Sequence, residues 1–278
     1  MRASQTHGRF SSITWRAVVL DPESRDSEGK TGLHIAASEG DAERCRALLL
    51  RGADPNVRSG EHIKEDDLYR DWYWAPGYTP LMLAARMGHV NIVRLLLDSG
   101  ADAKLADQFD GTALHAAVAG GNAEVVGLIL GAGAAPNHFC YLRHFEEGLG
   151  WYFIGTALHV AALNNHANIA ALLIEAGADH SAASFDMKTP LIYAAGRGFT
   201  DVIDVLCTLG ANPNAREHSY GYSAFLDSAP LHYAASNCHL DAWNALVRHG
   251  AEPLARESHS GKTALEIAQE RGMIDVQG

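Results

Sequence analysis

TALHAAVAGGNAEVVGLILGAGA, residues 112–134, holds the pattern that decides the fold. It begins with threonine, continues with leucine, histidine and paired alanines, and turns at two glycines. A second apolar stretch follows and ends in a Gly-Ala loop, so the segment predicts a helix, a turn, a second helix and a loop. The opening hexapeptide occurs seven times: TGLHIA at 31, TPLMLA at 79, TALHAA at 112, TALHVA at 156, TPLIYA at 189, APLHYA at 229 and TALEIA at 263.

The residue types of these units, which we number one to seven in chain order, have physical reasons. Threonine at the start caps free amide groups, and proline directly after it supplies a preset backbone angle without wasting a donor. Glycine between the helices permits the left-handed conformation that ends a helix. Asn165 can adopt that conformation at modest cost, whereas Cys238, at the position of Gly88, predicts either local strain or a local change of turn.

The pattern resembles the ankyrin repeat, whose T-P-L-H-x-A signature recurs in a unit of roughly 33 residues. The resemblance covers the chain from about residue 26 to the C-terminus. It implies an all-α ankyrin-repeat solenoid at 26–278 with six full repeats and a partial seventh, in which the first helices line a concave face and the loops project as hairpins. Residues 1–25 are expected to form an N-terminal segment with a capping helix around SSITWRAVVL, 11–20.

Every second unit is long. The hexapeptides start 48, 33, 44, 33, 40 and 34 residues apart. The extra residues form three insertions at the place of the hairpin, beginning after residues 57, 138 and 215, and each is preceded by a Pro-Asn pair: Pro55-Asn56, Pro136-Asn137 and Pro213-Asn214. Because neighbouring repeats stack at about 10 Å, alternate hairpins are expected about 20 Å apart along one edge.

The three insertions hold 14 of the 22 aromatic residues of the chain. Long loops in compact domains tend to be functional or disordered, and aromatic side chains argue against disorder. The insertions are therefore expected to pack on one another, to form a recognition wall, or to do both, because tyrosine and tryptophan give large contact areas at low entropic cost. The candidate binding residues here are Trp72, Tyr73, Trp74, Tyr78, Phe139, Tyr141, Trp151, Tyr152, Phe153, Tyr220, Tyr222 and Phe225.

Composition narrows the classes of partner. The chain has 278 residues, 47% of them hydrophobic, and a net charge of −11, which repels a phosphate backbone. The four cysteines form no CxxC pair, and no stretch approaches eighteen consecutive apolar residues. We therefore expect a cytoplasmic monomer that binds neither nucleic acid nor membrane.

Several of the 15 histidines have a structural explanation in the repeat. His34, His115, His159 and His232 occupy the L-H position of the hexapeptide, where the resemblance implies that they brace turns and neighbouring repeats. In the second insertion, His138, Cys140 and His144 match no standard zinc spacing, so no metal or other cofactor is expected. Cys140 is expected to be the only cysteine near a binding surface.

The concave face supplies further candidate binding residues. The exposed pair at the end of each first helix is expected to present an apolar groove with two cationic anchors, suited to an acidic and hydrophobic peptide or to an amphiphile with a carboxylate or phosphate. These candidates are Arg86, Met87, Val118, Leu163 and Arg197.

Two functions fit these features. The first is a non-enzymatic module that binds a protein or peptide between the concave face and the insertions. The alternative is a small-molecule or catalytic site under the insertions, for which the acid–base candidates are His144, His218, Glu146, Asp67 and Asp227. No nucleophile elbow, phosphate loop or dinucleotide fingerprint is present in the sequence, so nothing fixes a catalytic geometry.

Overall fold

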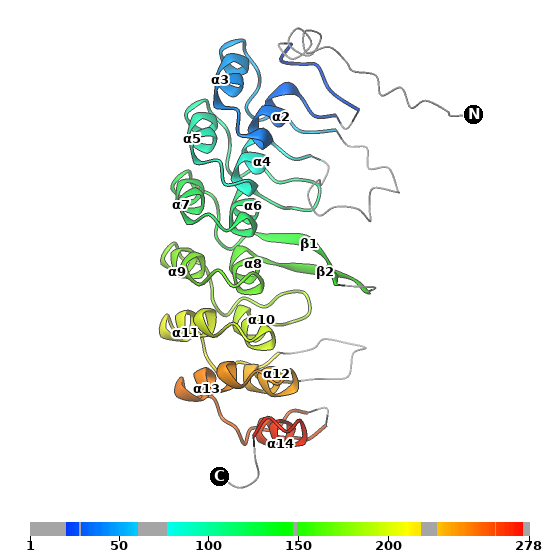
Figure 1. Cartoon of the computed structure of the whole chain (residues 1–278), viewed down its shortest axis with the longest axis vertical. Coiled ribbons are helices and arrows are strands. Elements are labelled where there is room, and N and C mark those ends of the chain that lie inside the picture. The colour runs from blue at the N-terminus through cyan, green and yellow to red at the C-terminus, as the bar shows by residue number, and fades with distance from the viewer. Residues whose placement is uncertain are drawn as a thin grey trace, which may run out of the picture.

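The computed structural model describes residues 21–27, 29–60, 77–146, 149–217, 227–258 and 260–274; at 142–146 and 149–154 it describes the backbone alone. The described part is a stack of helix pairs in two rows (Figure 1). The first helices form the inner row: α2 (Gly32–Glu39), α4 (Pro80–Arg86), α6 (Ala113–Gly120), α8 (Ala157–Leu163), α10 (Pro190–Arg197), α12 (Pro230–Ser236) and α14 (Ala264–Glu270). The second helices form the outer row: α3 (Ala42–Leu50), α5 (Val90–Asp98), α7 (Ala123–Gly131), α9 (Ala167–Glu175), α11 (Thr200–Thr208) and α13 (Leu240–Arg248).

The helices begin and end where the hexapeptide predicts. Thr79 accepts a hydrogen bond from the amide of Met82 at 3.4 Å, and Thr263 accepts one from Glu266 at 3.0 Å. Pro80 and Pro190 occupy the first position of α4 and α10. The predicted all-α solenoid is confirmed, and Asn165 has the predicted left-handed backbone, with φ of 58°. Cys238 keeps the same conformation, with φ of 57°, which is the strained alternative of the two considered for it.

The core runs the whole length of the stack as one layer between the two rows. The hexapeptide leucine and alanines of each unit contribute to it, and in unit three Leu114 and Ala117 are both 0% exposed. The outer helices add branched side chains such as Val93 and Ile129, also fully buried. Because each unit buries its apolar face only against its neighbours, stability is shared along the stack.

The hairpins project from the inner row on the side away from the outer helices (Figure 1). The second insertion adds the strands β1 (Phe139–Glu146) and β2 (Leu149–Thr156), which pair antiparallel with Phe139 opposite Thr156 and His144 opposite Trp151. Most of the first and third insertions, residues 61–76 and 218–226, lies outside the described residues, as does the expected capping helix at 11–20. No described helix is both long and apolar enough to cross a membrane.

Candidate binding surface

The hexapeptide histidines brace the stack. The amide of Thr156 donates to Nδ1 of His159 at 3.1 Å, so Nε2 carries the proton and donates to the carbonyl of Lys188 in the next unit at 3.1 Å. His115 repeats this arrangement with Thr112 and the carbonyl of His138. Burial lowers the pKa of both histidines from 6.5 to about 4, which keeps them neutral. The expected bracing role is therefore seen directly in the hydrogen bonds.

The Pro-Asn pairs before the insertions are also structural. Asn137 donates its amide to the carbonyl of Gly177 at 2.9 Å and accepts the amide N–H of Asp179 at 2.8 Å. Asn56 and Asn214 make the equivalent pair of bonds to the loops that begin at Gly100 and Gly250. Each asparagine thus fixes a long unit to the next short one, just before the chain enters its insertion.

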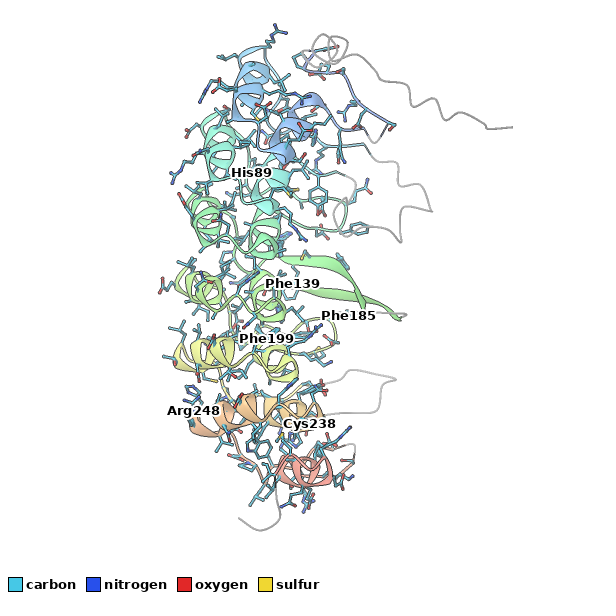
Figure 2. The ribbon with its side chains drawn as sticks, in the orientation of Figure 1. His89, Phe139, Phe185, Phe199, Cys238 and Arg248 are labelled. Atoms are coloured by element: carbon cyan, nitrogen blue, oxygen red, sulfur yellow. The ribbon has the colours of Figure 1, made fainter. Side chains whose placement is uncertain are left out.

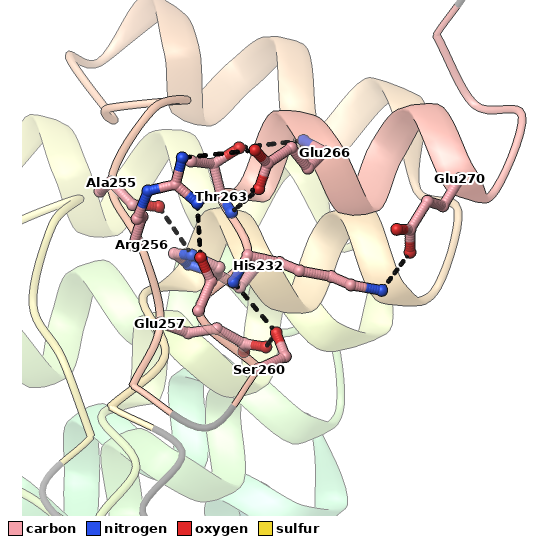
Figure 3. A network of polar contacts seen from close by, with 10 residues as sticks. His232, Ala255, Arg256, Glu257, Ser260, Thr263, Glu266 and Glu270 are labelled. Carbon is pink, nitrogen blue, oxygen red and sulfur yellow. Dashed lines mark hydrogen bonds and ion pairs between the residues drawn. The ribbon is translucent and has the colours of Figure 1, made fainter.

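Arginines connect the bases of neighbouring hairpins. Arg25 donates to the carbonyl of Arg58 at 2.7 Å, and Arg58 donates to the carbonyl of Ala106 at 2.7 Å. At the other end of the stack, Arg216 donates to the carbonyl of Arg256 at 2.9 Å. Arg256 in turn lies within ion-pair distance of Glu266, whose carboxylate also accepts the amide of Thr263 (Figure 3). These arginines therefore link the hairpin bases in two groups, one at each end of the stack.

The base of the second insertion separates its side chains by face. Phe139 and Tyr141 are 43% and 46% exposed, whereas Cys140 between them is fully buried. The amide of Tyr141 donates to the carbonyl of Phe109 at 2.7 Å, which ties β1 to the short hairpin of unit three. The expectation that Cys140 lies near a binding surface is wrong, because strand alternation turns its thiol into the protein. Burial raises the pKa of that thiol, so it stays protonated.

The concave-face candidates are only partly exposed. Met87 and Arg197 are exposed, and Arg86 and Leu163 are half-buried. Arg86 and Arg197 each have an interaction partner within the protein. The expected exposure of Val118 is wrong: it is 0% exposed. Val118 lies six residues after Thr112, and the residues in the same position of the neighbouring units, Ala85 and Ala162, are also 0% exposed. The side chain therefore belongs to the core-facing side of its helix.

Several predicted residues have no described side chain. Trp151, Tyr152, Phe153, His144 and Glu146 are placed on β1 and β2 by their backbone only. Outside the described residues lie Asp67, Trp72, Tyr73, Trp74, His218, Tyr220, Tyr222 and Phe225. Packing among the insertions, and a small-molecule site beneath them, therefore stay predictions.

The remaining polar candidates have structural partners. Asp227 forms an ion pair with Arg216 at 2.8 Å and accepts the hydroxyl of Ser258 at 2.9 Å. His138 bonds the carbonyl of Asp110 at 3.0 Å. Tyr78 is half-buried, packs against the core, and has its pKa raised by burial. Among the described residues, no three histidine, cysteine or acidic side chains are grouped as a metal site.

Two features on the hairpin side were not predicted from the sequence. Phe185, in the short hairpin of unit five, is 74% exposed. Figure 2 shows Phe139 and Phe185 on the hairpin side, whereas Arg248 lies on the outer row. Beside Phe185, the hexapeptide tyrosines Tyr193 and Tyr233 join a cluster of charged residues at the inner row. The sequence feature that could have indicated this cluster is the tyrosine at the fifth position of TPLIYA and APLHYA, where the other hexapeptides have an aliphatic residue.

Comparisons with known proteins agree with this architecture. A family model described as "Ankyrin repeats (3 copies)" matches residues 60–140 and 145–217, and one described as "Ankyrin repeat" matches 28–60 and 227–258. Human transient receptor potential cation channel subfamily A member 1 is 38% identical over 123 residues, covering 44% of this chain and 10% of that protein. The nuclear factor NF-kappa-B p105 subunit of Gallus gallus is 29% identical over 190 residues, or 68% of this chain and 14% of that protein. The chain thus spans a small part of the length of these curated relatives.

Solved structures give the same comparison over most of the chain. The crystal structure of the ankyrin repeat domain of Bcl-3, described as a unique member of the IkappaB protein family, superposes with a TM-score of 0.63 at 29% identity and covers 90% of this chain and 98% of that one. The human ASB11 ankyrin repeat domain superposes with a TM-score of 0.66 at 24% identity, covering 86% of this chain and 92% of that one. The second likeness concerns the fold alone.

Proposed function

Because the chain belongs to the ankyrin repeat family, we propose that it is a protein-binding module that holds a protein or peptide partner against its inner helices and projecting hairpins. Ankyrin repeats serve generally as protein-interaction modules, and this chain adds apolar surface where such a partner would arrive. The inner face is included because Met87 and Arg197 are exposed there, and the insertions are included because Phe139 and Tyr141 are partly exposed at the base of the second one.

The observation that carries the proposal is the outward placement of Phe139 and Tyr141. Both are more than two-fifths exposed on a hairpin that projects beyond the inner row, and the residue between them supplies the buried contact. Aromatic side chains on a held backbone are the residue type that most often dominates binding energy at protein interfaces. The fold does not need these two side chains for its own core, so their large apolar surface is available to a partner.

A double substitution tests the proposal. We expect Phe139→Ser with Tyr141→Ser to weaken capture of the partner from the native source at least tenfold, with only a modest fall of the unfolding midpoint, because both side chains are partly exposed and lie outside the core of the stack. Leu50→Ser is the matched control, since Leu50 is 83% exposed on the outer helix α3. Native mass spectrometry of the captured complexes compares the loss of partner in the double variant with the loss in the control. If the control weakens capture as much as the double substitution, the hairpin side is not the binding surface.

A further inference from the structure

The side chain of Glu217 breaks the pattern of the hairpin bases. Its amide donates to the carbonyl of Ser228 at 3.3 Å and closes the base of the third insertion, as the amide of Asp107 does with Gly111 in unit three. Asp107 uses its carboxylate to cap its own turn, accepting the amides of Phe109 at 2.7 Å and Gly111 at 2.9 Å. The longer side chain of Glu217 instead reaches the inner row, where its Oε2 accepts the hydroxyl of Tyr233 at 2.6 Å.

Within the described residues, the second carboxylate oxygen of Glu217 has no hydrogen-bond partner. The residue is 3% exposed, and Oε1 is a buried atom without a donor in the described part of the chain. A buried carboxylate oxygen that is left unpaired costs free energy, so proteins rarely keep one without a use for it. The unused acceptor is therefore the position where a donor from a partner would gain most.

The surroundings of Glu217 already hold a cation. The ammonium of Lys188 lies 5.2 Å from the ring centroid of Tyr233 and 5.8 Å from that of Tyr193. It also pairs with the carboxylate of Asp186 at 3.0 Å. Asp186 is fully engaged, since it accepts the hydroxyls of Tyr193 and Ser184 as well. Two tyrosine rings and two carboxylates thus form a setting that favours positive charge.

We propose that Glu217, Tyr193 and Tyr233 form a subsite for an arginine side chain of the protein partner, and that Lys188 fills it in the free protein. This inference rests on the proposed function and specifies the chemistry of the partner. A planar guanidinium can stack on the ring of Tyr233 while it donates to Oε1 of Glu217, which the ammonium of Lys188 does not reach as a hydrogen-bond donor. The side chain of Lys188 is long, flexible and 24% exposed, so it can move into water when the guanidinium enters. The net charge of −11 favours the approach of a basic segment to the protein as a whole.

A short peptide tests the subsite without the partner. The probe is acetyl-Gly-Arg-Gly-amide, and its counterpart carries citrulline, which has the shape of arginine but no charge. We expect chemical-shift changes in NMR spectra at residues 184–193 and 228–233 with the arginine peptide, and at least fivefold weaker binding of the citrulline peptide. Equal binding of the two peptides, or shift changes confined to other units, would overturn the inference.

Three variants make the test specific. Glu217→Gln should weaken the arginine peptide at least fivefold, whereas Glu257→Gln should leave it unchanged, because Glu257 occupies the equivalent base in the next unit and is already paired with Ser228 at 2.8 Å. Lys188→Met removes the resident cation and should strengthen binding severalfold, a gain that misfolding cannot produce. Unchanged affinity in both Glu217→Gln and Lys188→Met would overturn the inference.

The failure of the inference and the failure of the proposed function can be told apart. If capture of the protein partner still needs Phe139 and Tyr141 while the arginine peptide fails to bind, only the arginine subsite is wrong. If the arginine peptide binds and no protein partner is found, only the proposed function is wrong.

Discussion

At the residue scale, the turn between the two helices of a unit depends on the side chain that the next unit places against it. Gly198 has φ of 74°, and a Cβ there would lie 2.8 Å from the ring of His239, which bonds the carbonyl of Gly196 at 3.1 Å. Asn165 and Cys238 occur where the next unit carries Phe199 and Met273 at the histidine position. At Gly198 both the backbone angle and the available space therefore require glycine, whereas at positions 165 and 238 there is room for a side chain and only the angle favours glycine.

Cys238→Gly is expected to stabilise the protein. The cysteine holds φ of 57°, a conformation that costs a side-chain-bearing residue about 1 kcal/mol, whereas glycine adopts it freely. The greater entropy of glycine in the unfolded chain offsets part of the gain, so the net increase in unfolding free energy should be about 0.5 kcal/mol. Urea denaturation measures it. Gly198→Ala is the opposite control and should be clearly destabilising; a loss of stability in Cys238→Gly would show that the thiol makes a contact of value.

Replacement of a hexapeptide histidine tests the bracing role. His115→Ala leaves the amide of Thr112 and the carbonyl of His138 without their partner and opens a cavity, so the unfolding free energy should fall by about 3 kcal/mol. His115→Met should cost roughly half as much, since Met82 holds the same position in unit two and its sulfur accepts the amide of Thr79 at 3.5 Å. Thermal unfolding of both variants gives the ranking, and equal losses would contradict it.

At the element scale, the long and short units differ in how their loops are fixed. Only the long units carry the asparagine that bonds the next loop twice, and this pairing explains why the Pro-Asn signal and the insertions occur together. The asparagines hold the ends of the next units while the arginines hold the hairpin bases. The chain is therefore hydrogen-bonded to the next unit just before it enters each insertion.

Asn214→Ala should loosen the loop between units six and seven. The substitution removes the bonds to the carbonyl of Gly250 and from the amide of Glu252, both 2.9 Å long, and should cost about 1–2 kcal/mol. Hydrogen exchange at Glu252 should become faster, while exchange at the equivalent Asp179, held by Asn137, should stay as it was. Unchanged exchange at Glu252 would show that the loop does not depend on this side chain.

How far the sequence predicts the structure also differs between elements. The helix pairs follow from local signals that agree with one another: the threonine or alanine start, the apolar spacing and the glycine turn. The prediction that Val118 is exposed was wrong although the register of the hexapeptide contains the answer, since Val118 follows Thr112 by six residues as the buried Ala85 follows Thr79. Glu217 was missed for a different reason: its partner Tyr233 lies 16 residues away on the next inner helix.

At the scale of the whole molecule, the buried histidines make stability depend on pH. Burial lowers the pKa of His34, His115 and His159 to about 4 in the folded protein, while in the unfolded chain each titrates near 6.5. Between these values the unfolded chain binds more protons, so folding stability falls as the pH is lowered from 6.5 toward 4. Burial raises the pKa of Asp107 to about 6, which acts in the opposite direction over the same range. The contribution of the three histidines to the pH dependence of the unfolding free energy is larger than the opposite contribution of Asp107.

The unfolding free energy should therefore drop by several kcal/mol between pH 7.5 and pH 5, since each unit of pKa difference is worth about 1.4 kcal/mol per group. Urea denaturation at the two pH values measures the drop. In His159→Gln the fall in unfolding free energy should be smaller by the contribution of one buried histidine, although the variant is less stable than the parent protein at both pH values. A stability that rises on acidification would contradict the assignment of neutral, buried histidines.

The repeated unit, the linked hairpin bases and the outward aromatic side chains together support the proposal that a partner binds along the hairpin side of the stack. The most direct measurement is site-specific photo-cross-linking in the native source, with benzoylphenylalanine placed at Tyr141 on β1 or at Leu50 on α3. Both residues are exposed and apolar, and they lie on opposite sides of the stack. We expect a cross-link to one protein from position 141 and none from position 50. A partner cross-linked from position 50 and not from position 141 would place the binding surface on the outer row and contradict the account.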